Sequence, residues 1–421
     1  MKTFTNKSIF LNGFLLLLLL SFTFQQFSIP TTITPLRPYM VMVLIGGVVC
    51  LLKNFRIKLT RIDISLSVLY LYMMATIIYA EEIALSIQMF FGLILLLYSY
   101  FILRFFLYSC TLDELINKIY FVAVCFFILS FLLYVIGLLV HYLFDVSLVL
   151  EGEAGNRAVL LGVYFEGGVI PRMRGVCESP NNFGMYAVIM LPVWLNYSPG
   201  IKWWQVIIVA VMLILSFSVT MFISLICMFF IFIFNKFFNF NGKILNQTLI
   251  STAFYAVLIM FIGGSTYVIY SDSLIADVIP MIENRLARAS SGSGRFDLWQ
   301  YSWTLISEEP FLGYGLNQAR VLLLPFRAVN STHNNFIEIM LEGGIGGVFM
   351  YLFFLYSIFL TVFSKSLMKK ERQWVLLSFV GFFVFSNANV NIYADSMIFF
   401  MAIISTLPLL KKTEAYNSAR Q

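Results

Sequence analysis

The sequence predicts an all-α integral membrane protein with about twelve transmembrane helices. Apolar residues make up 60% of the 421 residues and charged residues only 11%, whereas a soluble domain carries roughly 25% charged residues. The charged residues fall in clusters, and the apolar runs between them are long enough to cross a bilayer, which takes roughly 20 residues. These runs lack the polar/apolar alternation of a membrane β-barrel.

The apolar runs place each expected span. The first follows Lys2 and Lys7 like a signal peptide, but no small-residue cleavage site follows it, so we expect a retained helix. Residues 203–217 and 219–235 are short, and a bent hairpin that does not cross fully also fits them. The expected spans lie near residues 9–29, 38–52, 64–80, 83–103, 119–140, 183–197, 203–217, 219–235, 247–269, 335–363, 373–389 and 392–410.

Basic residues orient the spans. With both termini in the cytoplasm, 18 of the 27 Lys and Arg residues, including all thirteen lysines and Arg104, fall on the cytoplasmic side. The nine others are all arginine, whose planar fork grips phosphate or carboxylate through two hydrogen bonds. The arginines therefore indicate a site for an oxyanion on the outer face. The alternative explanation for their segregation is random sequence drift together with a need for surface solubility. These nine are Arg37, Arg157, Arg172, Arg174, Arg285, Arg288, Arg295, Arg320 and Arg327.

The polar content lies mainly in two outer loops. Cys177 is the one cysteine of five expected outside the cytoplasm and the bilayer, so neither a disulfide nor a cysteine metal site is expected. The expected regions are 1–140 with spans one to five, the first outer loop at 141–182, 183–269 with spans six to nine, the large outer loop at 270–334, and 335–421 with the last three spans and a cytoplasmic tail.

Part of the large outer loop has a helical pattern. Residues 295–309 carry an apolar stripe at three- and four-residue spacing, which is typical of packing against other helices or the membrane surface. Pro310 ends this helix, and Gly313 and Gly315 form a turn before a short apolar run at 321–326. The stripe consists of Phe296, Trp299, Trp303 and Ile306.

A first motif precedes the sixth span. Its Pro and Asn residues are natural at a helix start, so a helix cap with a basic interface anchor explains it as well as a binding site does. It consists of Arg172, Arg174, Gly175, Glu178, Ser179, Pro180, Asn181 and Asn182.

A second motif leads into the tenth span and contains His333, one of two histidines. An isolated histidine is more often structural, but this one lies at a helix N-terminus, which favours anions. Glu338 and Glu342 are four residues apart on one face of that helix, at a depth where carboxylates face protein or water. Glycines follow at 343, 344, 346 and 347. Such glycines allow another backbone segment or a substrate to approach the helix closely, or allow helices to pack tightly.

Together these motifs resemble the O-antigen ligase/polymerase superfamily, integral membrane glycosyltransferases of the bacterial surface-polysaccharide pathway. The resemblance covers roughly residues 170–350. It is carried by Arg172, Arg174, Gly175, Pro180, Asn181, Asn182, Gly294, Arg295, Trp299, Pro310, Phe311, Leu312, Gly313, Tyr314, Gly315, His333, Asn334, Asn335, Phe336, Ile337, Glu338, Glu342, Gly343, Gly344, Ile345 and Gly346.

The resemblance implies a GT-C-like fold with one large periplasmic loop that contains short helices. It implies a bacterial inner-membrane enzyme that needs no metal or cofactor. Its expected partners are undecaprenyl-diphosphate-linked oligosaccharides as donor and acceptor, membrane lipid and a chain-length regulator protein, with no nucleic acid.

The resemblance also assigns roles to single residues. Arg172 or Arg174, together with Arg295, would grip the donor diphosphate, and His333 would be the catalytic base with Glu338 in reserve. Relatives often carry Ser-Arg in the hairpin of spans seven and eight, where this chain has Ser218, Val219 and Thr220. No role for that arginine is therefore carried over.

The expected function is a surface-polysaccharide polymerase. A ligase, which transfers the glycan to lipid A–core, is the alternative within the superfamily, because no residue here distinguishes the two acceptors. A flippase or transporter also suits about twelve spans, but the span centres are nearly free of charge and no inverted repeat is evident. A structural scaffold would leave the outer arginines unexplained.

Substitution of Arg295 tests the grip on the diphosphate. Lysine keeps the positive charge but lacks the planar fork, so we expect Arg295→Lys to lose most glycosyl transfer. The amount of polymer made by cells that carry this variant measures the effect. Near-normal polymer would argue against diphosphate binding by Arg295.

Overall fold

The computed structural model describes residues 2–29, 35–52, 57–144, 149–151, 157–166, 170–198, 200–237, 295–326, 331–364 and 367–418. The expected ninth span at 247–269 and residues 270–294 of the large outer loop lie outside this part. The described helices are α1 (Lys2–Thr23), α2 (Pro38–Leu52), α3 (Arg61–Ala75), α4 (Ile83–Tyr108), α5 (Leu112–Phe144), α6 (Pro180–Tyr197), α7 (Trp203–Leu215), α8 (Val219–Phe237), α11 (Arg295–Glu308), α12 (Ala319–Leu322), α13 (Asn335–Val362), α14 (Lys369–Ser386) and α15 (Asp395–Ser418), with short 3₁₀ helices η1 (Gln25–Phe27) and η2 (Thr76–Tyr79).

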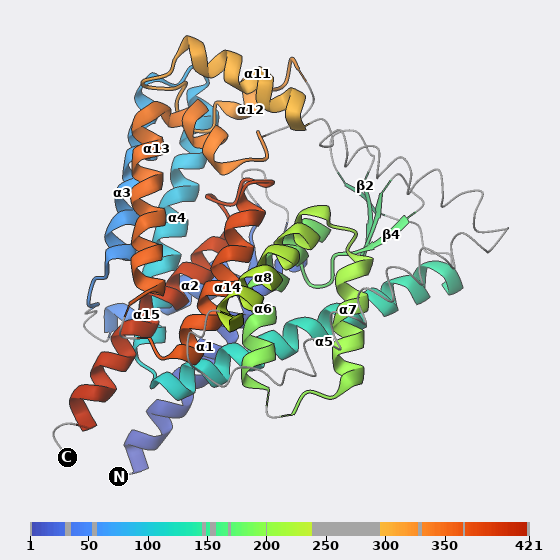
Figure 1. Ribbon diagram of the computed structural model, residues 1–421, viewed down its shortest axis with the longest axis vertical. Coiled ribbons are helices and arrows are strands. Elements are labelled where there is room, and N and C mark those ends of the chain that lie inside the picture. Colours follow the sequence, from blue (N-terminus) through green and yellow to red (C-terminus); the bar gives the residue numbers. More distant parts are fainter. Residues whose placement is uncertain are drawn as a thin grey trace.

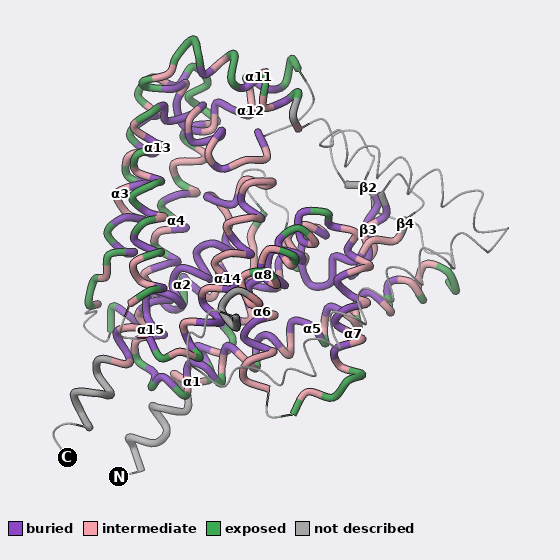
Figure 2. Tube along the Cα trace, viewed as in Figure 1, coloured by how far each residue is buried: buried purple, intermediate pink, exposed green. Residues whose placement is uncertain are grey.

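Several helices are suited to crossing a membrane. Large apolar side chains stay exposed along the outer sides of α3 and α13, as expected of a surface that faces lipid (Figure 2). Within the described residues, the helices that are long and apolar enough to span are Arg61–Tyr79, Ile83–Tyr108, Leu112–Phe144 and Asn335–Val362. Shorter apolar helices are Leu11–Thr23, Pro38–Leu52, Trp203–Leu215 and Val219–Ile233. The total of about twelve spans stays a prediction.

The helices place the two chain ends far from α11 and α12. Both ends lie at one end of the molecule, and α11 and α12 lie at the other (Figure 1). Between them, α3 packs against α4 and α13, α15 against α4, and α14 against α6 and α8. A small apolar cluster fixes α11 and α12 on the first turns of α13; its buried members are Leu298, Ile306, Ala319, Leu323, Ile337 and Leu341.

The helix expected at 295–309 is confirmed as α11, and Trp299 and Ile306 of the expected stripe pack in the cluster on α13. Leu298 and Ile306 are buried, whereas Trp303 is 55% exposed. An exposed indole suits a helix that lies near a membrane surface, where Trp is enriched.

The expectation of an all-helical chain is wrong for the first outer loop, which contains an antiparallel sheet in the order β1-β2-β3-β4. Short runs rich in Val, Ile, Tyr and Phe, separated by Gly and Asn, favour such strands, and hydropathy alone does not reveal them. The turn at Gly162 packs on α5, where a Cβ atom would lie 2.5 Å from the backbone nitrogen of Tyr134. The strands are β1 (Val149–Glu151), β2 (Arg157–Leu160), β3 (Val163–Glu166) and β4 (Ile170–Met173).

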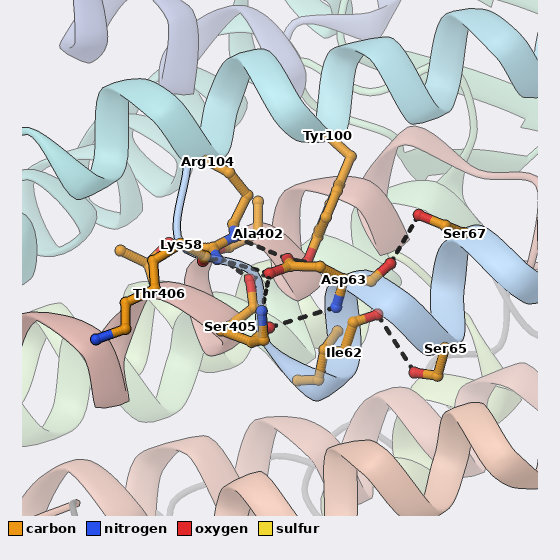
Figure 3. A network of polar contacts seen from close by, with 11 residues as sticks. Lys58, Ile62, Asp63, Ser65, Ser67, Tyr100, Arg104, Ala402, Ser405 and Thr406 are labelled. Carbon is orange, nitrogen blue, oxygen red and sulfur yellow. Dashed lines mark hydrogen bonds and ion pairs between the residues drawn. The ribbon is translucent and has the colours of Figure 1, made fainter. Parts of the chain in front are cut away.

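A buried ion pair joins α3 and α4, and a hydrogen bond connects it to α15 (Figure 3). Arg104 of α4 donates to both carboxylate oxygens of Asp63 of α3, at 2.9 and 2.8 Å, and to the Thr406 hydroxyl of α15 at 3.0 Å. Tyr100 also donates to Asp63. The expected span at 83–103 ends too early, because α4 continues past Arg104 to Tyr108 and a buried carboxylate neutralises the charge of Arg104.

Replacement of Arg104 tests this network. Arg104→Gln leaves the Asp63 carboxylate buried without its cation, which typically costs about 3–5 kcal/mol. We expect a clear fall in the melting temperature of the purified protein in detergent. Arg61→Gln, which changes an exposed arginine at the start of α3, is the control and leaves the melting temperature unchanged. Equal melting temperatures for the two variants would contradict the structural role.

Candidate active site

His333 lies directly before α13, in a backbone conformation that L residues rarely adopt. Its φ is 56°, in the left-handed region. Both neighbours are held in place: Thr332 donates its backbone N–H to the Glu338 carboxylate at 2.7 Å, and Asn334 caps α13 by accepting from the N–H groups of Phe336 and Ile337 at 2.9 and 3.3 Å. The surrounding contacts thus fix the strained residue at the helix start.

Helix α11 brings Arg295 to the same region. The Trp299 indole donates to the Thr332 carbonyl oxygen at 2.9 Å, and Arg295 lies about one turn earlier on this helix. Burial lowers the pKa of the Arg295 guanidinium, which nevertheless stays protonated in proteins. A partly desolvated cation beside a helix N-terminus favours an anionic partner.

Glycines allow the backbone of the turn at 313–315 to lie directly against the backbone of α13. α13 kinks at Gly344, where φ is 58°, and a Cβ atom there would collide with the Phe311 carbonyl oxygen. The turn at 313–315 is bound to α13 by hydrogen bonds from Tyr314 N to Leu341 O at 2.9 Å and from Gly315 N to Glu342 O at 2.8 Å.

The glycines also allow helix packing. A Cβ atom at Gly343 would lie 2.9 Å from the sulfur of Met73 on α3, and Tyr72 of the same helix donates to the Gly343 carbonyl oxygen at 2.9 Å. Both explanations of the glycines, close approach of backbone and helix packing, therefore hold.

The two carboxylates of α13 are buried and engaged. Glu338 accepts from Thr332, as described above, and Glu342 accepts from the Tyr393 hydroxyl at 2.7 Å. Glu338 thus holds the segment that carries His333. Among the described residues, no group of three or more His, Cys, Asp or Glu side chains is placed to hold a metal ion.

A connection that the sequence analysis missed supports the same helix start. α14 ends at Ser386 and α15 begins at Asp395, so residues 387–394 form a longer link than the expected spans allow. The Asn335 carboxamide accepts from the backbone N–H groups of Asn391 and Ile392 at 2.8 and 3.2 Å. The sequence does contain one feature that indicates this link, three asparagines in an apolar context at positions 387, 389 and 391.

The arginines of the first motif contact backbone carbonyl groups. Arg172 of β4 donates to the carbonyl oxygens of Ser216 and Phe217, in the turn between α7 and α8, at 3.0 and 3.2 Å. Arg174 is buried and donates to the carbonyl oxygens of Leu161 and Glu178 at 2.8 and 3.2 Å. The motif therefore joins the sheet, the start of α6 and the hairpin of α7 and α8.

A polar network, also missed, ties the first motif to α15. Arg37 donates to Glu178 at 2.6 Å and to Asp395 at 3.0 Å. Gln25 donates to Asp395 at 2.7 Å and accepts from Asn182 at 3.0 Å. Since Asp395 follows the link that holds Asn335, residues 387–395 connect the two motifs. A single acidic residue at the edge of an expected span gave no pattern to recognise.

Residues 204–352 match a family model described as O-antigen ligase. This match, over about a third of the chain, places residues 204–352 in the O-antigen ligase/polymerase superfamily. No curated protein matches the sequence. The matched stretch contains Arg295, His333, Glu338 and Glu342, whereas the motif with Arg172 precedes it. The resemblance is confirmed, and the protein is an integral membrane enzyme of glycosyltransferase type whose superfamily acts on lipid-linked saccharides.

The departure from the superfamily pattern has a structural counterpart. In the hairpin where relatives often carry Ser-Arg, the Ser218 hydroxyl donates to the Asn181 carboxamide at 3.2 Å. The guanidinium of Arg172 reaches the same turn through Ser216 and Phe217. An arginine thus lies at this hairpin although the hairpin does not carry one itself.

Two substitutions at Glu338 distinguish a positioning role from a role as base. The amide oxygen of Glu338→Gln still accepts from Thr332, so we expect polymer within about threefold of the wild type. Glu338→Leu leaves a buried N–H group without its acceptor, which costs about 1–3 kcal/mol, so we expect at least about a tenfold loss. Surface polysaccharide in cells measures both. Equal loss in the two variants would show that the carboxylate charge itself is required.

Proposed function

We propose that this enzyme is a polymerase of O-antigen or a related surface polysaccharide. It transfers a glycan from undecaprenyl diphosphate onto the terminal sugar of a second lipid-linked repeat unit. The observation that carries the proposal is the position of His333, held by hydrogen bonds on both sides at the start of the apolar helix α13, beside the helix whose first residue is Arg295.

In this proposal, arginines bind the diphosphate of the donor. The leaving group departs with two or more negative charges, and guanidinium groups fixed beside it lower the barrier by stabilising the charge as it develops. Arg295 is the first candidate, because it is partly desolvated and close to the His333 segment. Arg172 and Arg174 are the second candidates, and their bonds to carbonyl oxygens keep both guanidinium groups in fixed positions.

The chemical step is an inverting displacement. A hydroxyl group of the acceptor sugar attacks the anomeric carbon of the donor from the face opposite the diphosphate. The new glycosidic C–O bond forms as the bond to the phosphate oxygen breaks, and undecaprenyl diphosphate leaves with the bonding electrons. His333 takes the hydroxyl proton, and a base placed in this way typically adds about 10²–10⁴-fold. Glu338 holds the histidine segment and is the reserve base.

The orientation in the membrane follows from the same proposal. We assign both chain ends to the cytoplasm and α11 and α12 to the periplasm, across the bacterial inner membrane. The separation of the chain ends from α11 and α12 supports this assignment (Figure 1). The apolar helix surfaces then accommodate the polyprenyl tails of donor and acceptor.

A ligase is the second candidate, because the matching family model carries that description. The donor, the diphosphate site and the histidine would serve a ligase equally. The two differ in the acceptor, which is lipid A–core for a ligase and a lipid-linked repeat unit for a polymerase.

Deletion of the gene followed by complementation tests the proposal. We expect the deletion to leave single repeats attached, with no ladder of longer chains, and the wild-type gene to restore the ladder. His333→Ala restores no ladder at normal membrane abundance, since the hydroxyl proton loses its first acceptor. His141→Phe is the matched control, because it changes the other histidine and keeps an aromatic ring against Phe165, and it restores the ladder.

Two results would contradict the proposal. A full ladder with His333→Ala would remove the histidine from the mechanism. Loss of all attached glycan in the deletion strain would identify a ligase instead of a polymerase. Gels of surface polysaccharide show both.

A further inference from the structure

Asp395, the first residue of α15, is a buried carboxylate to which the proposed transfer assigns no role. Its side chain is 1% exposed. Two outer segments donate to it: Arg37 to Oδ2 at 3.0 Å and Gln25 to Oδ1 at 2.7 Å. The backbone N–H of Ser396 also donates to Oδ1, at 2.9 Å. Burial of a carboxylate is costly unless it is paired and hydrogen-bonded, so these partners keep the charge in place.

The cation of this group is engaged by protein carboxylates. Arg37 donates through Nη1 to Asp395 and through Nη2 to Glu178, at 2.6 Å for the second bond. Two carboxylates and one guanidinium leave the group with net negative charge, which repels a diphosphate. In this Arg37 differs from Arg172 and Arg174, which donate to backbone carbonyl oxygens. Arg37 therefore joins segments of the protein and does not bind the donor.

On one side, two bridges tie Asp395 to the first motif. The ionic bridge ends at Glu178, whose backbone carbonyl oxygen accepts from Arg174 at 3.2 Å. The neutral bridge is Gln25, which is 3% exposed and accepts from the Asn182 carboxamide in the first turn of α6 at 3.0 Å. Both bridges end beside the arginines that the proposed function assigns to the diphosphate.

On the other side, Asp395 follows a link that is bound to the start of α13. The Asn335 carboxamide, two residues after His333, accepts from two backbone N–H groups of this link at 2.8 and 3.2 Å. The Tyr70 hydroxyl of α3 donates to the Ile392 carbonyl oxygen of the same link at 2.6 Å. Three residues of extended chain span at most about 11 Å, so Asp395 stays close to this fixed point.

We propose that Asp395 is a positioning residue that sets the distance between the arginines of the first motif and the His333 segment. The inference rests on the proposed function, in which the arginines hold the donor and His333 takes the proton of the acceptor hydroxyl. Reacting atoms must lie about 3–3.5 Å apart, and a displacement of about 1 Å costs about 10²-fold in rate. A carboxylate bound to both segments keeps the acceptor in reach of the donor.

Hydrolysis is the expected consequence of a displaced acceptor. Water then attacks the anomeric carbon in place of the sugar hydroxyl. A C–O bond to the water oxygen forms as the bond to the phosphate oxygen breaks, undecaprenyl diphosphate leaves with the bonding electrons, and one proton of the water passes to solvent. The ratio of free saccharide to extended chain therefore reports the position of the acceptor. Partly unfolded protein makes less of both products and leaves this ratio unchanged.

A reaction of the purified protein with one defined lipid-linked repeat unit gives this ratio, with both products measured by mass spectrometry. We expect the ratio to rise at least about tenfold in Asp395→Asn, because the side chain keeps its size and loses the charge that holds Arg37. Asp113→Asn is the matched control, since it makes the same change at an exposed residue in the first turn of α5, and it keeps the wild-type ratio.

Arg37→Lys covers the case in which Asp395→Asn does not fold. Lysine keeps a cation beside the two carboxylates, so we expect an unchanged melting temperature. Its single nitrogen replaces the two nitrogens that bind Asp395 and Glu178 separately. We expect the ratio of free saccharide to extended chain to rise about threefold or more, since the connection loosens.

Two outcomes are distinguished by the wild-type protein. If the wild type extends chains and the folded variants keep its ratio, the proposal is overturned, even where both products fall together, because the network then only stabilises the fold. If the wild type makes no extended chain, the proposed function itself fails.

Discussion

The backbone of the turn at 310–315 touches the backbone of α13 at Gly344, and the placement of α11 follows from this contact. Hydrogen bonds from this turn to Leu341 and Glu342 hold the two segments together where neither has room for a Cβ atom. The chain on either side of the turn then forms α11 and α12, so the contact also brings Trp299 to the Thr332 carbonyl oxygen. The glycines thus position the site.

Buried acidic side chains near His333 are all engaged in hydrogen bonds. At the His333 end, Glu338, Glu342 and Asp395 are buried and each accepts a hydrogen bond from a neighbouring segment. These bonds join the two outer motifs through residues 387–395 and hold together the segments around His333, whose φ is 56°.

The sequence predicted the features that depend on residues close together in the chain. The run at 295–309 contains its own helix and stop signals, and α11 appears there. The sheet was missed because its strands are three or four residues long and hydropathy does not detect them. The burial of Arg104 and the role of Asp395 depend on partners 41 and 358 residues away. Such pairings arise from packing, and no local pattern encodes them.

The central claim is that the His333 region passes a saccharide from a lipid diphosphate to a sugar hydroxyl. A reaction with purified protein and one defined lipid-linked repeat unit tests it most directly, with products identified by mass spectrometry. The account predicts lipid-linked chains of two or more repeats and one undecaprenyl diphosphate released for every glycosidic bond formed. Release of free saccharide without chain extension, or no release of the diphosphate, would contradict it.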